Sequence, residues 1–152
     1  MRGVSIEADR LKSYGFVAVQ GLALGLFALT GPVIALDPVF LVLEVMGGAL
    51  GVWAIWAMRL GNFGVTPDIT VGGRFVSRGP YNYIRHPMYA SLLLMTLALL
   101  LSHFSPFRLA VWAILLLDLW LKLSFEETKL VAHFEEYASY RQRTTRLVPF
   151  LF

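Results

Sequence analysis

The chain has 152 residues, of which 57% are hydrophobic and 15% are charged, and its mean hydropathy is +0.65. Soluble domains carry about 25% charged residues, so this composition excludes an ordinary soluble protein and indicates an integral membrane protein. The formal net charge of +3 comes from residues that flank apolar runs, so nucleic acid is not an expected partner. The absence of cysteine excludes disulfides and cysteine-ligated metals, and no metal site is predicted.

Two apolar runs in the first part of the chain predict membrane-spanning helices. Residues 14–36 contain no charge and are long enough to cross a bilayer, which needs about 20 apolar residues. The residues before this run are expected to form a short lead-in at the membrane surface. Asp37-Pro38 is predicted to be the whole turn before a second span at residues 39–58. Glu44, inside the second span, is interpreted as a neutral or snorkelling group near the far interface.

A long connection at residues 59–85 separates these spans from a second pair of apolar runs. Its glycines and Pro67 argue against a continuous helix, and a loop of this length in a small bundle is usually functional. Residues 88–101 and 107–121 are predicted to form a helical hairpin. The predicted fold is therefore all-α, with about four transmembrane helices in a single domain covering residues 1–152.

The positive residues predict how the helices are oriented. Of the 13 Lys and Arg residues, all but Arg108 precede the first span, lie in the 59–85 connection or follow the fourth span. Because cytosolic loops carry an excess of Lys and Arg, both termini and the long connection are predicted to face the cytosol. The expected location is the plasma (inner) membrane of a prokaryote, or the endoplasmic reticulum in a eukaryote.

Two polar and aromatic clusters are predicted to meet at the cytosolic face. The first is SRGPYNYIRHPMY at residues 77–89, and the second starts at Glu126-Glu127 and continues into a tail rich in Tyr and Arg. Aromatic faces suit a cation, and a carboxylate accepts hydrogen bonds from ribose hydroxyls or an ammonium. Because neighbouring residues of a helix point about 100° apart, only one of the two glutamates is expected in the site.

These two clusters carry a family resemblance. RFVSRGPYNYIRHPMY at residues 74–89, followed after one apolar hairpin by EETKLVAHFEEYASYRQRTTRLVP at residues 126–149, resembles the isoprenylcysteine carboxyl methyltransferase family, which is similar to the phospholipid N-methyltransferases. The resemblance implies a membrane methyltransferase that uses S-adenosylmethionine (SAM). Its catalytic part would cover about residues 59–150, with residues 14–36 and 39–58 as additional spans. The loop before the hairpin and the tail would form a cytosolic cofactor pocket, and the substrate would be a lipophilic small molecule or lipid from the bilayer.

The resemblance also assigns residues to roles. The implied cofactor-binding residues are Arg74, Phe75, Val76, Tyr81, His86, Pro87, Met88, Tyr89 and Glu126. Lys122 stands where the carboxyl methyltransferases place an arginine for the substrate carboxylate. The chemistry adds two further catalytic candidates, which are Arg143 as a second cation and Glu127 as a carboxylate able to take a proton.

The methyl acceptor is open between two chemistries. O-methylation of a carboxylate, of the isoprenylcysteine type, is the preferred prediction, and it needs an orienting cation but no base. N-methylation of a phospholipid or another amine requires loss of a proton, for which a carboxylate or His86 is the candidate base. Functions of other classes are an NADPH-dependent membrane reductase and a non-catalytic membrane scaffold.

Overall fold

A computed structural model describes residues 2–58 and 75–149, with side chains from residue 7 onward. In these segments the chain is helical, as predicted, and its one β-contact is an isolated parallel bridge between Ile84 and Thr145. The elements are α1 (Arg2–Leu29), α2 (Pro38–Met58), the short 3₁₀ helix η2 (Gly79–Asn82), α3 (Pro87–Ser102), α4 (Pro106–His133) and α5 (Tyr137–Arg143).

Two of the described helices are long and apolar enough to cross a membrane, over Glu7–Leu29 in α1 and Pro38–Met58 in α2. The predicted end of the first span at residue 36 was wrong. Helix α1 already begins at Arg2, and it ends at Leu29, before Gly31-Pro32, because a proline disfavours helical backbone in the residue before it. The connection to α2 therefore covers residues 30–37 instead of the Asp37-Pro38 turn alone.

The second pair of apolar runs forms the predicted hairpin of α3 and α4. Proline opens both helices, at Pro87 and Pro106, where its missing N–H costs no helical hydrogen bond. Ser105 caps α4 by accepting a hydrogen bond from the Arg108 backbone N–H at 3.1 Å. Helix α4 is 28 residues long and continues to His133, past the end of the apolar run at residue 121 by more than the expected turn or two, whereas α3 has 16 residues. That α3 and α4 cross the membrane stays a prediction.

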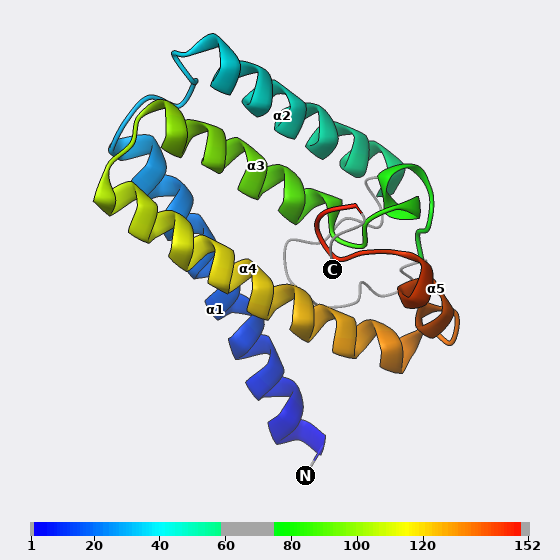
Figure 1. The fold of residues 1–152 in the computed structure, drawn as a ribbon. Coiled ribbons are helices and arrows are strands. Elements are labelled where there is room, and N and C mark those ends of the chain that lie inside the picture. Colours follow the sequence, from blue (N-terminus) through cyan, green and yellow to red (C-terminus); the bar gives the residue numbers. More distant parts are fainter. Residues whose placement is uncertain (1, 59–74, 150–152) are drawn as a thin grey trace.

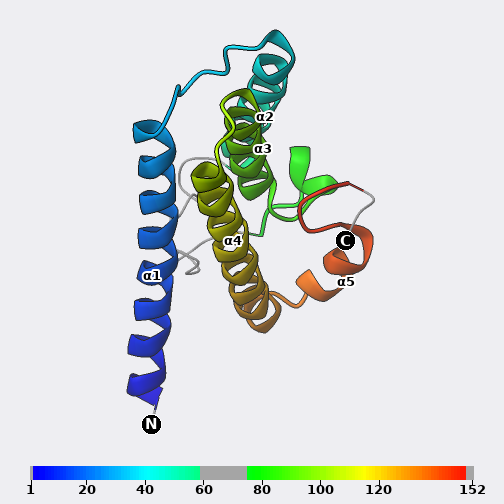
Figure 2. The same ribbon diagram turned by 60° about the vertical axis from the view of Figure 1, so that its left-hand side comes forward.

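The hairpin lies between the other two long helices (Figure 1). Helix α2 runs beside α3, and α1 runs along α4 on the other side, as the turned view confirms (Figure 2). The α2–α3 contact is close at Gly47, whose carbonyl accepts a hydrogen bond from Ser91 Oγ at 2.6 Å. A Cβ at Gly47 would stand 3.1 Å from the Met95 backbone nitrogen, so this approach requires glycine. The buried core of α1, α3 and α4 includes Phe27, Leu99, Leu100, Val111, Leu115 and Leu119.

Buried polar groups hold together the end of the bundle farthest from α5. Glu44 is buried and accepts a hydrogen bond from the Ala35 backbone N–H at 2.7 Å, so it stabilises the connection between α1 and α2. Arg108 is also buried, with its guanidinium 4.8 Å from the centre of the Phe27 ring and its Nη2 bonded to the Leu99 carbonyl at 3.3 Å. Glu44, which was interpreted as a group near the far interface, therefore also has a structural role.

Candidate active site

The loop that carries GPY is fixed to the C-terminal end of α2, which the orientation prediction places at the cytosol. Gly79 has a φ of +61°, which favours glycine, and a Cβ there would lie 3.0 Å from Ala57 Cβ. Arg78 Nε donates to the Ala57 carbonyl at 2.9 Å. Tyr81 is buried behind this turn, and its carbonyl accepts a hydrogen bond from Tyr140 Oη at 2.6 Å. The loop is thus tied to both α2 and α5.

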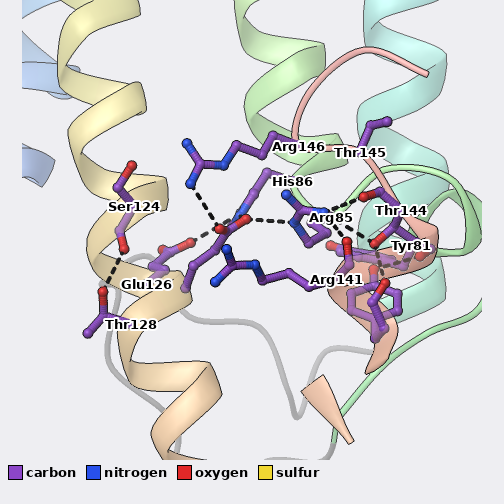
Figure 3. Close-up of polar contacts among 12 residues, drawn as sticks. Tyr81, Arg85, His86, Ser124, Glu126, Thr128, Arg141, Thr144, Thr145 and Arg146 are labelled. Carbon is purple, nitrogen blue, oxygen red and sulfur yellow. Dashed lines mark hydrogen bonds and ion pairs between the residues drawn. The ribbon is translucent and has the colours of Figure 1, made fainter. Parts of the chain in front are cut away.

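The tail after α5 pairs with the residues immediately before α3. Arg85 N donates to the Thr145 carbonyl at 2.8 Å, and His86 N donates to the Arg146 carbonyl at 3.0 Å. In return, Thr145 N donates to the Tyr83 carbonyl at 3.1 Å. These backbone bonds align the Arg85-His86 pair with the Arg146 side chain, and all three reach toward the part of α4 that carries Glu126 (Figure 3).

Glu127 is the anion around which these cations gather. Its carboxylate lies 2.6 Å from Arg85 Nε, 3.2 Å from Arg146 Nη2 and 3.3 Å from His86 Nε2. The residue is only 2% exposed. Burial alone would raise the pKa of Glu127, but hydrogen bonds and charge from His86 and Arg85 outweigh burial and lower the pKa to about 2. Glu127 is therefore ionised at neutral pH.

His86 lies between both glutamates. Its Nδ1 is 3.4 Å from a Glu126 oxygen, while its Nε2 faces Glu127. Burial lowers the pKa of His86, but the hydrogen bonds and charges of the two carboxylates outweigh burial and raise it above the ordinary value. The two ring nitrogens point in different directions, so each meets one carboxylate and both glutamates contact His86. That only one of them enters the cofactor pocket stays a prediction. His86 is thus favoured as an imidazolium.

Tyr89 joins this charged cluster to the interior of the bundle. Its ring stacks on the His86 ring with centroids 5.5 Å apart, and its hydroxyl donates a hydrogen bond to Glu126. The Lys122 ammonium lies 5.1 Å from the centre of the same ring, a distance at which cation–π attraction acts. A single aromatic side chain therefore contacts the imidazole, a carboxylate and an ammonium.

Lys122 belongs to a polar stripe on α4 that consists of Asp118, Lys122 and Glu126, each one turn from the next. Lys122 is 2% exposed and donates to Gln20 Oε1 of α1 at 3.0 Å. Asp118 is 6% exposed, and its Oδ2 has no hydrogen-bond partner within residues 7–58 and 75–149. The stripe extends the charged cluster away from the tail and toward the N-terminal half of α4.

The remaining predicted residues are placed differently. Phe75 packs against the rings of Phe134, Tyr137 and Tyr140, with centroids 4.9–5.9 Å apart, so it contacts the tail. Val76 and Met88 pack around Ala54, Ala57 and Tyr81. Pro87 is buried at the start of α3. Arg143 is exposed on α5, and the described contacts do not join it to Lys122 or Glu126. Arg74 lies outside the described residues.

Three further residues take part in this site. Arg85 was open between a membrane anchor and a site residue, and it binds Glu127 and also donates to the Arg141 carbonyl at 3.1 Å and to the Thr144 carbonyl. Arg146 was open between a lipid-binding residue and a cation that orients a substrate carboxylate. Gln20 was given no role, although it is the one polar side chain between residues 15 and 29. That isolation in an apolar run is the signal that could have identified it.

Comparison with known protein families shows to which family this chain belongs. A family model described as phospholipid methyltransferase matches residues 39–137, which include α3, α4, both glutamates and all of α2 except its first residue. A comparison with curated proteins finds no match. The finer resemblance to isoprenylcysteine carboxyl methyltransferases stays a prediction. Because the match covers more than half of the chain, the protein belongs to the phospholipid methyltransferase family, a family of membrane methyltransferases.

Proposed function

We propose that the protein transfers a methyl group from SAM to a lipid or another lipophilic acceptor in the membrane. The observation that carries this proposal is the cluster of His86, Tyr89, Glu126 and Glu127, which lies inside the family-matched segment. It joins an aromatic face, an imidazole and carboxylates at the end of the α3–α4 hairpin. When bound, SAM supplies an electrophilic methyl group on a sulfonium.

The side chains present fit the charges of SAM. The Glu126 side chain is 18% exposed and offers carboxylate lone pairs to an ammonium or to ribose hydroxyls. Arg146 is a quarter exposed at its side chain, and its described contacts use Nη2 for Glu127, which leaves other guanidinium N–H groups for a carboxylate. The Tyr89 ring suits a cation. These residues would hold the cofactor beside the stripe of Asp118, Lys122 and Glu126.

An amine is the acceptor that the polar stripe supports best. Lys122 has Asp118 one turn away on one side and Glu126 one turn away on the other, so the stripe carries two carboxylates and one ammonium. Asp118 Oδ2 is buried and lacks a hydrogen-bond partner within the described segments, so it can accept a hydrogen bond from an ammonium. An amine must lose a proton before or during methyl transfer, and Asp118 or Glu126 can take it. The chain's own contribution is then alignment and proton removal.

A carboxylate acceptor is the second candidate, and Lys122 favours it. Its buried ammonium would orient a substrate carboxylate beside Tyr89, as the resemblance to carboxyl methyltransferases implies. No base is required in that case. The two acceptors make different demands on the stripe, because an amine needs a carboxylate, Asp118 or Glu126, and a carboxylate needs the Lys122 ammonium.

Two measurements test the proposal. Titration of the purified protein with S-adenosylhomocysteine and NADPH separates a methyltransferase from a reductase or a scaffold. His86→Ala and Glu126→Ala should each weaken S-adenosylhomocysteine binding by roughly 10- to 150-fold, which corresponds to the loss of a hydrogen bond to a charged group. Glu136→Ala, on an exposed position before α5, is the matched control and should bind normally. Unchanged binding in both site variants would remove the proposed cofactor site.

Initial rates then distinguish the acceptors. Asp118→Asn should lower turnover of amine lipids by about 10²-fold or more if its carboxylate acts as the base, and should spare carboxylates. Lys122→Met should lower turnover of lipid carboxylates and spare oleylamine, an amine that has no anionic oxygen. Lipid amines that are methylated normally by both Asp118→Asn and Glu126→Gln would refute the amine reading, and lipid carboxylates that are methylated normally by Lys122→Met would refute the carboxylate reading.

A further inference from the structure

Helix α1 brings one polar side chain to the methyltransferase site, although it lies outside the family-matched segment 39–137. Gln20 is on the face of α1 that packs against α4. On the same face, the Phe16 and Phe125 rings have centroids 6.1 Å apart, and Arg108 lies over Phe27. An amide inside a bilayer is costly unless it is hydrogen-bonded, so the partners of Gln20 need to be identified.

The contact with Lys122 determines how the Gln20 amide is oriented. Lys122 Nζ lies 3.0 Å from Gln20 Oε1, and an ammonium has donors but no acceptor. The amide oxygen must therefore face Lys122, and Nε2 with its two N–H donors must point elsewhere. Within the described segments, the contact with Lys122 is the one hydrogen bond of the Gln20 side chain, so Nε2 donates to no acceptor there. Gln20 thus completes its acceptor side within the protein and leaves a pair of donors beside a buried ammonium.

We propose that Gln20 and Lys122 form a binding site for an anionic oxygen of the lipid acceptor, which is either a phosphate oxygen or a carboxylate oxygen. This inference rests on the proposed function and assigns the acceptor head to the α1–α4 side of the site. An anion in a region of low dielectric needs both an opposite charge and hydrogen-bond donors. Lys122 supplies the charge, and Gln20 Nε2 supplies the donors.

The position of the Gln20–Lys122 pair relative to Asp118 and Glu126 indicates how either acceptor would bind. Lys122 lies over Tyr89 and one turn from Glu126, whereas Asp118 is one turn away in the other direction. In a phospholipid with an amine head, an oxygen held by Gln20 and Lys122 leaves the ammonium within reach of the flanking carboxylates. In a lipid carboxylate, the held oxygen belongs to the group that is methylated. Gln20 is therefore a positioning residue for either acceptor.

The test measures lipid binding without turnover. Protein saturated with S-adenosylhomocysteine is titrated in detergent micelles with dioleoylphosphatidylethanolamine, oleate and oleylamine. Oleylamine has the amine and the chain but lacks an anionic oxygen. The variants are Gln20→Leu, which removes both halves of the amide, and Gln20→Glu, which keeps an oxygen toward Lys122 but removes the donors and repels anions. Thr30→Val is the control, because this hydroxyl of residue 30 bonds only the Leu26 carbonyl of the same turn at 2.6 Å.

Gln20→Leu should weaken binding of the phospholipid, of oleate or of both by about three- to tenfold, as expected for one hydrogen bond. Gln20→Glu should weaken it further, and oleylamine and S-adenosylhomocysteine should bind within twofold of wild type. Which of the two lipids responds identifies the source of the oxygen. Combination with Lys122→Met should be non-additive, because both residues act on the same group.

Equal loss of all three lipids in Gln20→Leu would show a purely structural role and overturn the inference, as would unchanged binding of both oxygen-bearing lipids in Gln20→Leu and Gln20→Glu. Failure of wild-type protein to bind either lipid would overturn it as well. Selective, Gln20-dependent lipid binding by a protein that transfers no methyl group would support this site while rejecting the proposed function.

Discussion

Replacement of Glu127 by glutamine tests whether the charged cluster is as strongly coupled as its geometry indicates. The variant keeps the shape of the side chain and an acceptor oxygen but removes the charge that Arg85, His86 and Arg146 share. Removing one partner of a buried ion pair leaves the other charges uncompensated, which typically costs about 3–5 kcal/mol. The cost falls on the junction of the loop, α4 and the tail.

The magnitude also follows from the pKa of Glu127. A fall from 4.5 to about 2 corresponds to about 3 kcal/mol of stabilisation of the folded state at neutral pH. Because the folded-state pKa is lowered, this contribution is complete above pH 4.5 and is lost as the pH falls toward about 2. For a domain of this size, roughly 2–4 °C per kcal/mol predicts a Tm that is about 6–12 °C lower in Glu127→Gln at pH 7.

The assay is thermal unfolding in detergent micelles at several pH values between 7 and about 2, a range that includes the loss of the Glu127 contribution below pH 4.5. Wild type and Glu127→Gln should differ most at pH 7 and converge as the pH falls. Glu135→Gln, which makes the same change at an exposed position, is the control and should match the Tm of wild type at every pH. A Tm difference below about 2 °C at pH 7, or one that stays constant on acidification, would refute the coupling described here.

Two further predictions concern the scaffold. Gly47→Leu should destabilise the protein by about 1–3 kcal/mol, because the new side chain would meet α3. Gly48→Leu is the control and should leave the Tm nearly unchanged, since a Cβ there has no heavy atom within 4 Å. Equal Tm values for the two variants would contradict the described α2–α3 contact. For topology, reporter fusions at residues 37, 70, 104 and 152 should give a cytosolic signal only at 70 and 152, and a cytosolic signal at 37 or 104 would reverse the predicted orientation.

The hairpin was the part of the fold that sequence patterns predicted best. Proline at the first turn of α3 and α4, and Ser105 as a cap, are local signals that do not depend on tertiary contacts. The end of α1 was missed because the charge-free run continues to residue 36, whereas the helix ends at Leu29, before Gly31-Pro32. The end of α4 was missed because apolarity stops near residue 121 while helical periodicity continues, with Leu123 and Glu127 both buried.

One part of the candidate site was predictable, because a helical hairpin brings the start of its first helix close to the end of its second helix. That rule placed His86 near Glu126 and Glu127, and the structure confirms that they meet. The Gln20–Lys122 contact was not predictable, because it depends on the register between two helices that are far apart in the sequence. The roles assigned to Arg143 and Lys122 remain predictions, because they depend on which acceptor the protein uses. The choice of acceptor is determined by where side chains lie in the site and not by a sequence motif.

The parallel pairing of residues 83–86 with residues 144–146 also constrains how the protein matures. The loop partner is synthesised before the hairpin, and the tail partner only after it, so this contact has a large sequence separation and forms late. Until the tail arrives, Glu127 lacks the Arg146 cation and Arg85 lacks the Thr144 carbonyl. A nascent chain can therefore insert its helices while its charged cluster is still unassembled, and enzymatic competence is expected only once translation has passed Arg146.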